Sequence, residues 1–396
     1  MTPGRLLSLA AAGWWWCSTA VLLLSFVAAL LHPLRRRDAG LADRHSALTA
    51  IVPVKELHFG FSEAQQSLFT QNYQPLEVLV ASAEPDSPAL STASQIRQRF
   101  PDVLSRIVIS RCRGAASPKL NNIWPAICHA ANDLVLTKDS NVVLHAGDVA
   151  AFVECLRTDV GLVSAIPIAT DPMTFAAWIE ASIINGYHAR VLMLGDAIGL
   201  GFGLGKIMLF RRTDLMRAGG FDCLKWALGE DMAIARAMQR SGLRTVLARR
   251  VCHQTLGQRS LSDVWQRQLR WMTIWRVQLP AALLADFFGS AIPAGIAGAV
   301  AAPLIGLSPA SAFAGSVTAW FGIEFILCVV KGWPISFWSP FAFLAREFFT
   351  LALWLRAWMS NEVSWAGTKY RVRSREAQPA PTLSNEYDVA AREKPQ

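Results

Sequence analysis

The stretch LTAIVPVKELHFGFSEAQQSLFTQNYQPLEVLVASA, residues 48–83, contains the pattern that decides the fold. LTAIVPV (48–54) is a continuous apolar run of the length of one buried strand, and LEVLVASA (76–83) is a second. Between them, SEAQQSLFTQ (62–71) has the pattern of a helix. A strand, a helix and a strand in this order predict two parallel strands joined by a helical crossover.

The alternation continues along the chain. RIVIS (106–110) predicts a third strand, KLNNIWPAICHAA (119–131) a helix, and NVVLHAGD (141–148) a fourth strand. We therefore expect an α/β domain over residues 44–280, with a mostly parallel sheet and helices on both of its faces. Ligands of such sheets bind beyond the carboxyl ends of the strands, so the residues that follow strands are the candidates for function.

The composition indicates that part of the chain lies in lipid. Of its 396 residues, 53% are hydrophobic and 17% are charged, and the mean hydropathy is +0.30. Soluble domains carry about 25% charged residues. The net charge is +9, but many basic residues adjoin apolar segments, which favours anionic lipid headgroups over nucleic acid as the partner. The seven cysteines show no paired spacing, which argues against a disulfide or zinc framework and fits a reducing cytosolic compartment.

The first apolar segment is long enough to cross a bilayer. Leu6–Leu31 contains no charged residue, and a membrane helix needs about 20 apolar residues. A cleaved signal peptide is the alternative, but the run exceeds the usual length of its apolar part. We expect an anchor over residues 1–37, with the following domain on the cytoplasmic side, because one arginine precedes the run and three follow it: Arg35, Arg36 and Arg37.

A second apolar region covers residues 281–360. Phe313–Val330 and Phe337–Trp358 are candidate spanning segments, whereas Ala291–Leu307 is shorter and could span, form a re-entrant hairpin or pack inside a bundle. A basic tail should be cytoplasmic, which requires an even number of crossings in this region, either two or four. We expect residues 376–396, which are polar and contain proline, to be disordered.

Acidic residues follow two of the predicted strands. Glu84 and Asp86 follow the second strand, and Asp148 ends the fourth. These carboxylates could meet in one crevice, where they would bind a nucleotide diphosphate through a divalent cation, Mg²⁺ or Mn²⁺. Aspartate and proline in EPDSP are also ordinary turn formers, which is the structural alternative.

The segment GEDMAIARAMQRSG (229–242) predicts a helix with Glu230 and Asp231 at its start. Acidic residues in a first turn favour the helix dipole, which would explain them without any function. Alternatively, one of the two carboxylates faces the crevice and acts as a general base.

In RQLRWMTIWR (267–276), Arg267, Arg270 and Trp271 have the spacing that places side chains on one face of a helix. Two guanidinium groups and an indole suit a phosphate group with a stacking partner. An amphipathic helix at the membrane surface is the alternative.

The glycine-rich stretch GLGFGLGK (199–206) is not a Walker A motif, because its glycines and lysine do not have the required spacing. Glycines at alternate positions favour either a close approach of the backbone to a substrate or a flexible loop.

The order of these motifs resembles that of family 2-type inverting glycosyltransferases, and in detail that of the ceramide glucosyltransferase group, family 21. SPKLNNIWPA (117–126) is similar to that group's N-P-K-I-N-N-L stretch, and AGGFD (218–222) followed by GEDMAIARAM is similar to its A-G-G and E-D block. SWAGTKYRV (364–372) resembles the W-x-G-x-x-Y-x-V ending of related bacterial enzymes. The resemblance implies a GT-A type fold with membrane helices at both ends of the chain.

The resemblance also implies roles for single residues. Glu84 stands where the family has its first aspartate, which contacts the nucleoside, and Asp86 is a nearby substitute. Asp231 matches the catalytic base, and Lys119 matches a lysine near the nucleotide. In the family, an R-x-x-R-W face binds the diphosphate and helps to shape the acceptor site. The residues that match it here are Arg267, Arg270 and Trp271.

The family's metal-binding D-x-D motif would fall on Ala146, Gly147 and Asp148. Its first acid is therefore absent, and Asp148 alone would hold the metal, which Mg²⁺ tolerates when phosphates supply other ligands. His145 either contributes to this site or forms a structural hydrogen bond.

The implied function is the transfer of a hexose from a nucleotide sugar to the hydroxyl of a membrane lipid. UDP-glucose is the expected donor, and ceramide is the expected acceptor. A hopanoid or another lipid is an alternative acceptor. Ala146 raises a second alternative, a degenerate membrane protein that only binds sugar nucleotides. The expected partners are a UDP-sugar, a lipid acceptor and the bilayer, with no nucleic acid. The expected location is a bacterial inner membrane, with several crossings and a cytoplasmic catalytic domain.

Overall fold

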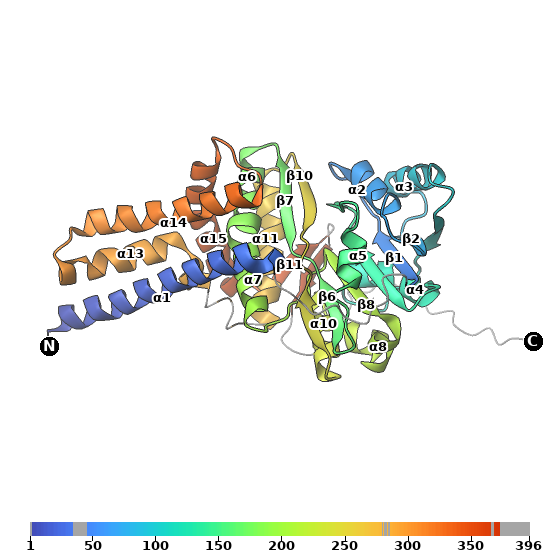
Figure 1. Cartoon of the computed structure of the whole chain (residues 1–396), viewed down its shortest axis with the longest axis horizontal. Coiled ribbons are helices and arrows are strands. Elements are labelled where there is room, and N and C mark those ends of the chain that lie inside the picture. Colours follow the sequence, from blue (N-terminus) through green and yellow to red (C-terminus); the bar gives the residue numbers. More distant parts are fainter. Residues whose placement is uncertain are drawn as a thin grey trace, which may run out of the picture.

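The computed structural model describes residues 2–34, 46–278, 280, 283, 286–365 and 368–372. An α/β domain forms one part of it, and three helices project from this domain side by side, with the amino terminus at their far end (Figure 1). The sheet is mostly parallel and has helices on both faces, which confirms the predicted fold class.

Seven strands form the main sheet in the order β3-β2-β1-β4-β8-β6-β9. β1 pairs in parallel with β2 and β4, and β2 pairs in parallel with β3, whereas β8 is antiparallel to both of its neighbours. The carboxyl ends of the first four strands therefore share the edge at which β8 begins. The strands are β1 Leu48–Pro53, β2 Leu76–Ser82, β3 Leu104–Ile109, β4 Leu134–Lys138, β6 Val160–Ser164, β8 Ile207–Arg211 and β9 Arg244–Leu247.

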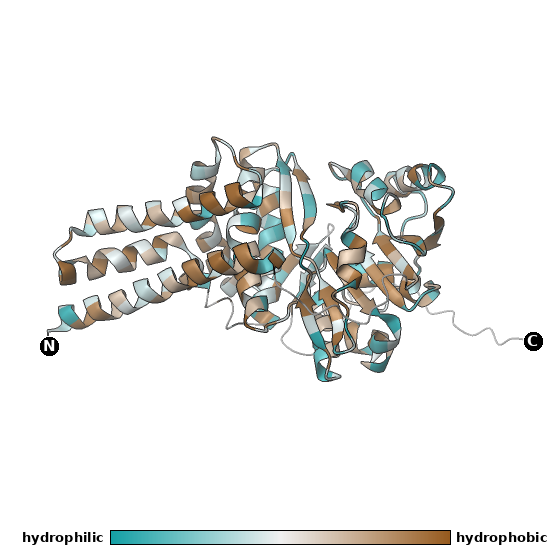
Figure 2. Cartoon of the chain, viewed as in Figure 1, coloured by the Kyte–Doolittle hydropathy of each residue, from teal (hydrophilic) through white to brown (hydrophobic). Residues whose placement is uncertain are grey.

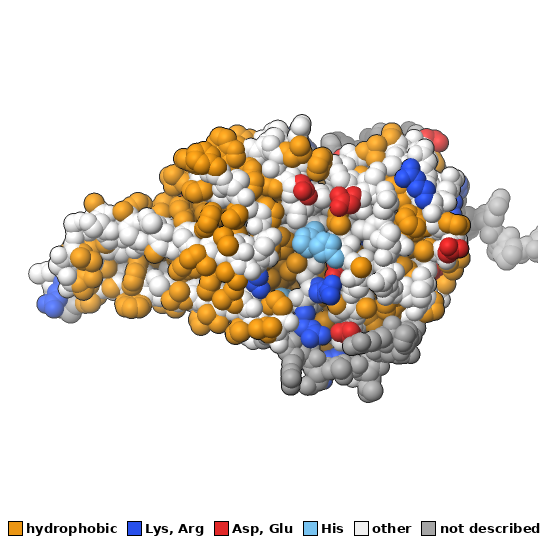
Figure 3. Space-filling model, turned by 45° about the horizontal axis from the view of Figure 1, so that its top comes forward, with side chains coloured by type: hydrophobic (Ala, Val, Ile, Leu, Met, Phe, Trp, Pro, Cys, Tyr) orange, Lys and Arg blue, Asp and Glu red, His pale blue; other side chains and the backbone are white. Residues whose placement is uncertain are grey.

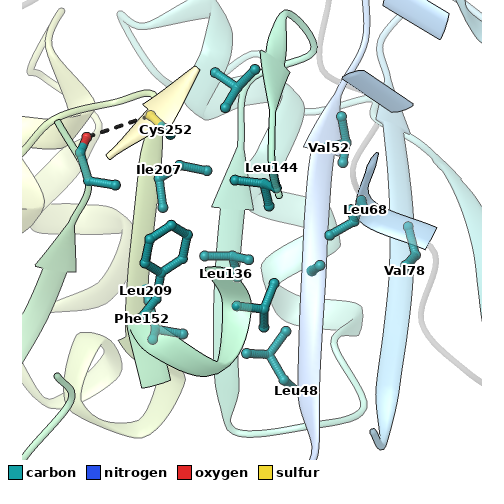
Figure 4. Packing of buried hydrophobic residues seen from close by; sticks show 14 of the residues in the cluster. Leu48, Val52, Leu68, Val78, Leu136, Leu144, Phe152, Ile207, Leu209 and Cys252 are labelled. Carbon is teal, nitrogen blue, oxygen red and sulfur yellow. Dashed lines mark hydrogen bonds between the residues drawn. The ribbon is translucent and has the colours of Figure 1, made fainter. Parts of the chain in front are cut away.

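Helices bury both faces of this sheet, which explains why its central strands are continuous apolar runs. One face is covered by α2 (Phe61–Phe69), α3 (Pro88–Gln98) and α5 (Asp148–Val153). The other is covered by α4 (Pro118–His129), α8 (Arg212–Arg217), α9 (Gly220–Leu224) and α10 (Glu230–Arg240). Figure 4 shows side chains of the first core from the sheet, α2 and α5, among them Leu48, Leu136, Leu209, Leu68 and Phe152.

The predicted fourth strand at 141–148 is wrong. The strand of the main sheet in this region is β4, and only β5 (Val142–Val143) is extended beyond it. β5 belongs to a separate three-stranded sheet with β10 (Cys252–Gly257) and β7 (Pro167–Pro172). Gly147 then adopts a left-handed backbone conformation, with φ +81°, and α5 begins at Asp148.

A helical layer lies between the sheet and the projecting helices. α6 (Phe175–Ala181), the π-helix η2 (Ser182–Ala189) and α7 (Arg190–Ala197) follow one another without a break. α11 (Leu261–Gln278) packs against α6 and against α15 (Ser339–Met359). The helix predicted for 267–276 is therefore confirmed as part of α11.

The three projecting helices are α1 (Pro3–Leu31), α13 (Ala291–Ala301) and α14 (Pro309–Lys331), with short 3-10 turns η1 (His32–Leu34), η3 (Asp286–Gly289) and η4 (Ala302–Ile305) at their ends. α13 packs between the other two, where a Cβ added to Gly295 would lie 2.8 Å from Val317. Small residues of this kind let membrane helices approach closely. Trp15 also donates a hydrogen bond of 2.9 Å to Ser316, which joins α1 to α14.

Two helices of the described chain are long and apolar enough to cross a bilayer, the segment Pro3–Leu34 and α14. The shorter apolar segment Ala291–Ile305 runs away from the domain between them, and α14 returns toward it (Figure 1). Hydrophobic residues are distributed along all three helices (Figure 2), and Figure 3 shows hydrophobic side chains along the whole projecting part, interspersed with other side chains and backbone. Two C-terminal crossings would satisfy the expected even number, which stays a prediction.

The candidate spanning segment Phe337–Trp358 forms α15, which is not among the helices that are apolar enough to cross. It packs on α11 and α6 instead. After α15 the chain forms an antiparallel hairpin of β11 (Glu362–Trp365) and β12 (Thr368–Arg371). The tail at 376–396 lies outside the described residues, as do Arg35, Arg36 and Arg37.

Three charged residues of the C-terminal apolar region, Glu324, Arg346 and Glu347, belong to a buried network. Glu324 of α14 lies 3.1 Å from Arg190 of α7 and 2.9 Å from Arg346 of α15, and Arg346 also lies 2.8 Å from Glu347. Charged groups in such surroundings are stable only when they are paired. These pairs therefore fasten α14 and α15 to the domain.

Candidate active site

Asp139 follows β4 directly, at the edge where the parallel strands end. Its Oδ1 lies 2.7 Å from Nζ of Lys119, and its Oδ2 lies 2.9 Å from Nζ of Lys206. Lys119 is in the first turn of α4, whose start is capped by the Ser117 hydroxyl. Lys206 precedes β8, and the antiparallel pairing of β4 with β8 brings it beside Asp139.

Two further carboxylates reach this place from the start of α10. Glu230 Oε1 lies 3.1 Å from Lys119 Nζ, and its Oε2 accepts a hydrogen bond of 3.0 Å from Ser117. Asp231 Oδ2 accepts a hydrogen bond of 2.9 Å from the backbone N–H of Gly205. We call the resulting group the acid–lysine cluster, which consists of Asp139, Glu230, Asp231, Lys119 and Lys206.

The charges in the acid–lysine cluster shift the pKa values of its members in opposite directions. Burial and the neighbouring charge of Glu230 raise the pKa of Asp231 to about 6. Burial alone would also raise the pKa of Asp139, but Lys119 and Lys206 outweigh it and hold that pKa well below its usual range. Asp231 is therefore the carboxylate of the cluster best suited to take up a proton near neutral pH.

The glycines of GLGFGLGK lie against the protein's own backbone. A Cβ added to Gly203 would overlap the carbonyl oxygen of Asp231, and one added to Gly201 would overlap that of Thr245. A Cβ on Gly205 would lie 3.2 Å from both the Asp231 carboxylate and Nζ of Lys119. The close approach expected of this stretch is thus made to the main chain, and it lets the loop pass directly beside Asp231.

α11 brings two arginines close to the acid–lysine cluster. The charges of Glu230 and Asp139 act to raise the pKa of Arg270, and the charge of Arg267 acts to lower the pKa of Lys206. Arg267 is tied by an ion pair of 3.4 Å to Glu180, whose side chain is fully buried. Arg270 forms no ion pair with the described residues. Burial, and then the charge of Arg267, lowers its pKa to about 10, so it stays a cation at neutral pH. Trp271 is partly buried on α11.

Glu84 and Asp86 lie in the turn between β2 and α3, at the same edge of the sheet as Asp139. Both side chains are exposed, and neither carboxylate forms a hydrogen bond or ion pair with the described residues. The structure thus places them on the correct edge but does not bring them into the acid–lysine cluster.

Asp148 begins α5 and has partners of its own. Its Oδ1 lies 3.0 Å from Arg250, and its Oδ2 accepts a hydrogen bond of 2.7 Å from the backbone N–H of His145. The ring of His145 lies 4.4 Å from that of His253. Ala146, in the turn before α5, is exposed and does not follow a strand of the main sheet.

These surroundings do not fit the expected metal ion. No group of three or more His, Cys, Asp or Glu side chains in the described ranges is arranged to hold one. Both oxygens of Asp148 are engaged by Arg250 and the chain, and both oxygens of Asp139 are engaged by lysines. We therefore derive no step of the reaction through a metal.

The arrangement nevertheless has a clear chemistry. Lysine and arginine side chains converge with Asp231 at one edge of the sheet, and such cations bind phosphate oxygens. The side chains of Asp139, Lys119 and Lys206 remain 22%, 13% and 15% exposed, so a ligand can reach them from solvent. The site can hold a diphosphate and, at the same time, accept a proton.

Two members of this cluster, Asp139 and Lys206, are not among the site residues that the sequence predicts. LVLTK (134–138) is a short run that ends in a lysine, whereas NVVLHAGD (141–148) is an apolar run that leads to an acid, so the pattern favours the second as the strand. The signal that could have found Asp139 is its position directly after an apolar run that follows a helix. Nothing local marks Lys206, since only the pairing of β4 with β8 brings it there.

Comparisons with known proteins identify a family and a fold that the chain resembles. Residues 17–378 match the model of glycosyl transferase family 21. Ceramide glucosyltransferase 3 of Caenorhabditis elegans is 22% identical over 357 residues, which cover 88% of this chain and 77% of the relative. Ceramide glucosyltransferase 1 of the same organism is 21% identical over 333 residues, which cover 82% and 71%.

Among solved structures, the mannosyltransferase PcManGT of Pyrobaculum calidifontis, in complex with GDP-Man and Mn²⁺, superposes with a TM-score of 0.52. The match covers 89% of this chain and 99% of that one at 18% identity. A likeness at this identity concerns the fold alone, and it confirms the expected GT-A type.

Proposed function

The chain belongs to glycosyl transferase family 21 and is a glycosyltransferase, and from this premise we propose its reaction. The protein transfers a hexose, with inversion at the anomeric carbon, from a nucleotide sugar to the hydroxyl of a membrane lipid. UDP-glucose is the proposed donor and ceramide the proposed acceptor. The names of the relatives support glucose as the sugar and ceramide as the acceptor, since both reported relatives are ceramide glucosyltransferases.

The donor's diphosphate is bound by the cations around the acid–lysine cluster. Arg270, which forms no ion pair with the described residues, supplies one guanidinium. Arg267, which an ion pair with Glu180 holds in place, supplies a second, and Lys206 supplies an ammonium group. Positive groups that are fixed in advance stabilise the charge that develops on the leaving diphosphate. Glu84 and Asp86, at the same edge of the sheet, are the proposed contacts of the nucleoside, with Trp271 at the acceptor side of α11.

Asp231 is the proposed general base, and its environment is the observation that carries the proposal. Its pKa of about 6 leaves it mostly deprotonated at neutral pH and still basic enough to take a proton. As the acceptor oxygen forms its bond to the anomeric carbon, Asp231 takes the hydroxyl proton, and the bond from that carbon to the diphosphate breaks. Attack from the face opposite to the diphosphate gives inversion.

The acceptor enters from the bilayer, which we propose the projecting helices α1, α13 and α14 span. α11 and α15 lie between these helices and the sheet, so the lipid hydroxyl would pass these two helices to reach Asp231 (Figure 1). The proposed location is the bacterial inner membrane, with the α/β domain in the cytoplasm, as the arginines after the first apolar segment predict.

The alternative of a degenerate sugar-nucleotide-binding protein rested on Ala146. That residue lies outside the acid–lysine cluster, and Asp139 supplies a carboxylate after the central strand. The reason for expecting an inactive protein is therefore removed. A hopanoid or another lipid remains the alternative acceptor, and it is an outcome of the test below.

The test uses membranes that contain the full chain, radiolabelled UDP-glucose, and ceramide or a hopanoid polyol as acceptor. We expect labelled ceramide from the wild type and from Asp222→Asn, which removes an acid that is 83% exposed and lies outside the cluster. Asp231→Asn should be slower by about 10²–10⁴-fold, the usual contribution of a general base. Equal turnover of Asp231→Asn and the wild type would falsify the role of Asp231. Label on the hopanoid alone would replace ceramide as the acceptor.

A further inference from the structure

The hairpin that follows α15 forms one wall of the candidate active site. Val363 of β11 and Val372, which follows β12, are buried together with Leu228 and Ile274. Leu228 lies three residues before Asp231, and Ile274 lies one turn after Arg270 on α11. The hairpin is thus held by apolar packing against the segments that carry the proposed base and the proposed phosphate ligand.

From this wall, β11 contacts Arg270 in a specific way. The guanidinium carbon of Arg270 lies 5.1 Å from the centre of the Trp365 ring, which is the geometry of a cation–π contact. Its Nη1 also donates a long hydrogen bond of 3.5 Å to the carbonyl oxygen of Ser364. Arg267, one turn earlier on the helix, is held by the carboxylate of Glu180 instead.

The difference between these two partners matters for anion binding. A carboxylate neutralises a guanidinium and occupies its N–H groups, whereas a ring face attracts the cation and leaves its N–H groups free. Arg270 is therefore held in place without losing its charge or most of its hydrogen-bond donors. This is the condition that a ligand of a diphosphate must meet.

We propose that Trp365 is a positioning residue for the donor, which fixes the Arg270 guanidinium so that its charge and N–H groups meet the diphosphate. The proposal rests on the proposed function and deepens it. It assigns a role to the W-x-G-x-x-Y-x-V ending, which the reaction scheme leaves unused. Trp365 itself touches Arg270 and acts on the donor only through it.

The chain contains a matched control on the same helix. Arg276 of α11 lies with its guanidinium carbon 5.5 Å from the centre of the Trp358 ring, so it makes the same kind of contact. Arg276 is bonded to Asn361 and shows no electrostatic interaction with the acid–lysine cluster. Loss of the Trp358 ring removes the same chemistry without reaching the proposed donor site.

The experiment measures UDP affinity by calorimetry, and the donor KM and kcat, for the full chain in lipid nanodiscs. For Trp365→Leu we expect UDP affinity to fall and donor KM to rise by about 5- to 30-fold, which corresponds to ~1–2 kcal/mol for a desolvated cation–π contact. Trp365→Phe should restore most of the loss, and Trp358→Leu should stay within about twofold of the wild type. A tryptophan that only supported folding would reduce the amount of active enzyme, and so kcat, but not KM.

The proposal is overturned if Trp365→Leu weakens UDP binding no more than Trp358→Leu does, if Trp365→Phe is as weak as Trp365→Leu, or if the wild type binds no UDP. In an Arg270→Gln background, Trp365→Leu should change UDP affinity less than twofold, because the two residues act through one contact. A wild type that binds UDP but transfers no sugar would refute the proposed function while leaving the UDP comparison intact.

Discussion

Removing the negative charge of Glu230 should move the pH dependence of transfer toward lower pH. With an Asp231 pKa of about 6, about 90% of the base is deprotonated at pH 7 and about 10% at pH 5. The deprotonated form is the active one, so kcat/KM should be high above pH 6 and should fall as the pH drops below 6. Between pH 7 and pH 5 we expect a decrease of about tenfold. After burial, the charge of Glu230 is the largest cause of the raised pKa. Glu230→Gln should therefore lower the pKa of Asp231. The acidic limb of the pH profile, where kcat/KM falls with falling pH, should then move to lower pH.

Lys119 provides the opposite perturbation, because its charge lowers the pKa of Asp231. Lys119→Met should shift the acidic limb of the profile to higher pH. The control is Glu154→Gln, which removes a negative charge that is paired with Arg249 at 3.2 Å, away from the cluster. That variant should keep the wild-type profile.

The assay is the initial rate of lipid glucosylation between pH 4.5 and 8.5, at constant ionic strength and with subsaturating donor, so that it reports kcat/KM. The informative quantity is the midpoint of the acidic limb, since a loss of overall rate leaves it unchanged. The assignment of the limb to Asp231 is refuted if the midpoint stays in place in Glu230→Gln, or if the two cluster variants move it in the same direction.

Three further experiments test other parts of the structure. Asp139→Asn should lower transfer more than about tenfold, because it removes the acidic partner of Lys206 and one of the two acidic partners of Lys119. Asp148→Asn should change transfer and its response to Mn²⁺ less than about twofold, because Asp148 lies outside the acid–lysine cluster and its carboxylate is held by Arg250 and His145. The reverse order in the same assay would restore Asp148 to the site. Gly203→Ala should lower the free energy of unfolding by ~1–3 kcal/mol through overpacking. Gly315 has open space around it, so Gly315→Ala should leave the free energy of unfolding equal or higher. Equal thermal midpoints of the two variants in detergent would contradict the close approach at Gly203. Glu324→Gln should lower the free energy of unfolding by ~3–5 kcal/mol because it breaks a buried ion pair, and an unchanged thermal midpoint would argue against the network.

The sequence predicts the elements whose pattern is long and regular. The strand at 48–54 and the helix at 229–242 agree with β1 and α10 within a few residues. Buried central strands and amphipathic helices leave such patterns because packing on a sheet dictates them. The same holds for the arginine spacing on α11, which places Arg267 and Arg270 as expected.

The fourth strand shows where this reasoning fails. β4 contains Lys138, whose side chain is fully buried, and burial lowers its pKa to about 7. A lysine is rarely placed inside a core, so the pattern favours the neighbouring run, which contains no lysine, over the true strand. Because the wrong run is predicted as the strand, the acid predicted at its end is Asp148 and not Asp139.

The contacts that complete the candidate site join residues far apart in the chain. Lys119 meets Glu230 across more than a hundred residues, and Arg270 meets Trp365 across nearly as many. Neither partner carries a local mark of the other, because only the packed sheet and the hairpin after α15 bring them together. Such pairings become visible only when the topology is known.

The surroundings of Lys119 have a consequence that follows from counting hydrogen-bond donors. An ammonium group has three N–H bonds, and Lys119 directs them at three acceptors, which are Asp139, Glu230 and the carbonyl oxygen of Gly205. Its donors are thus saturated by the protein itself. Lys206, by contrast, meets only Asp139 and Asn141 among the described residues, which leaves one of its three N–H bonds available. Of the two lysines, Lys119 is the internal counterion that holds the acids together, and Lys206 is the one that can donate a hydrogen bond to an incoming anion.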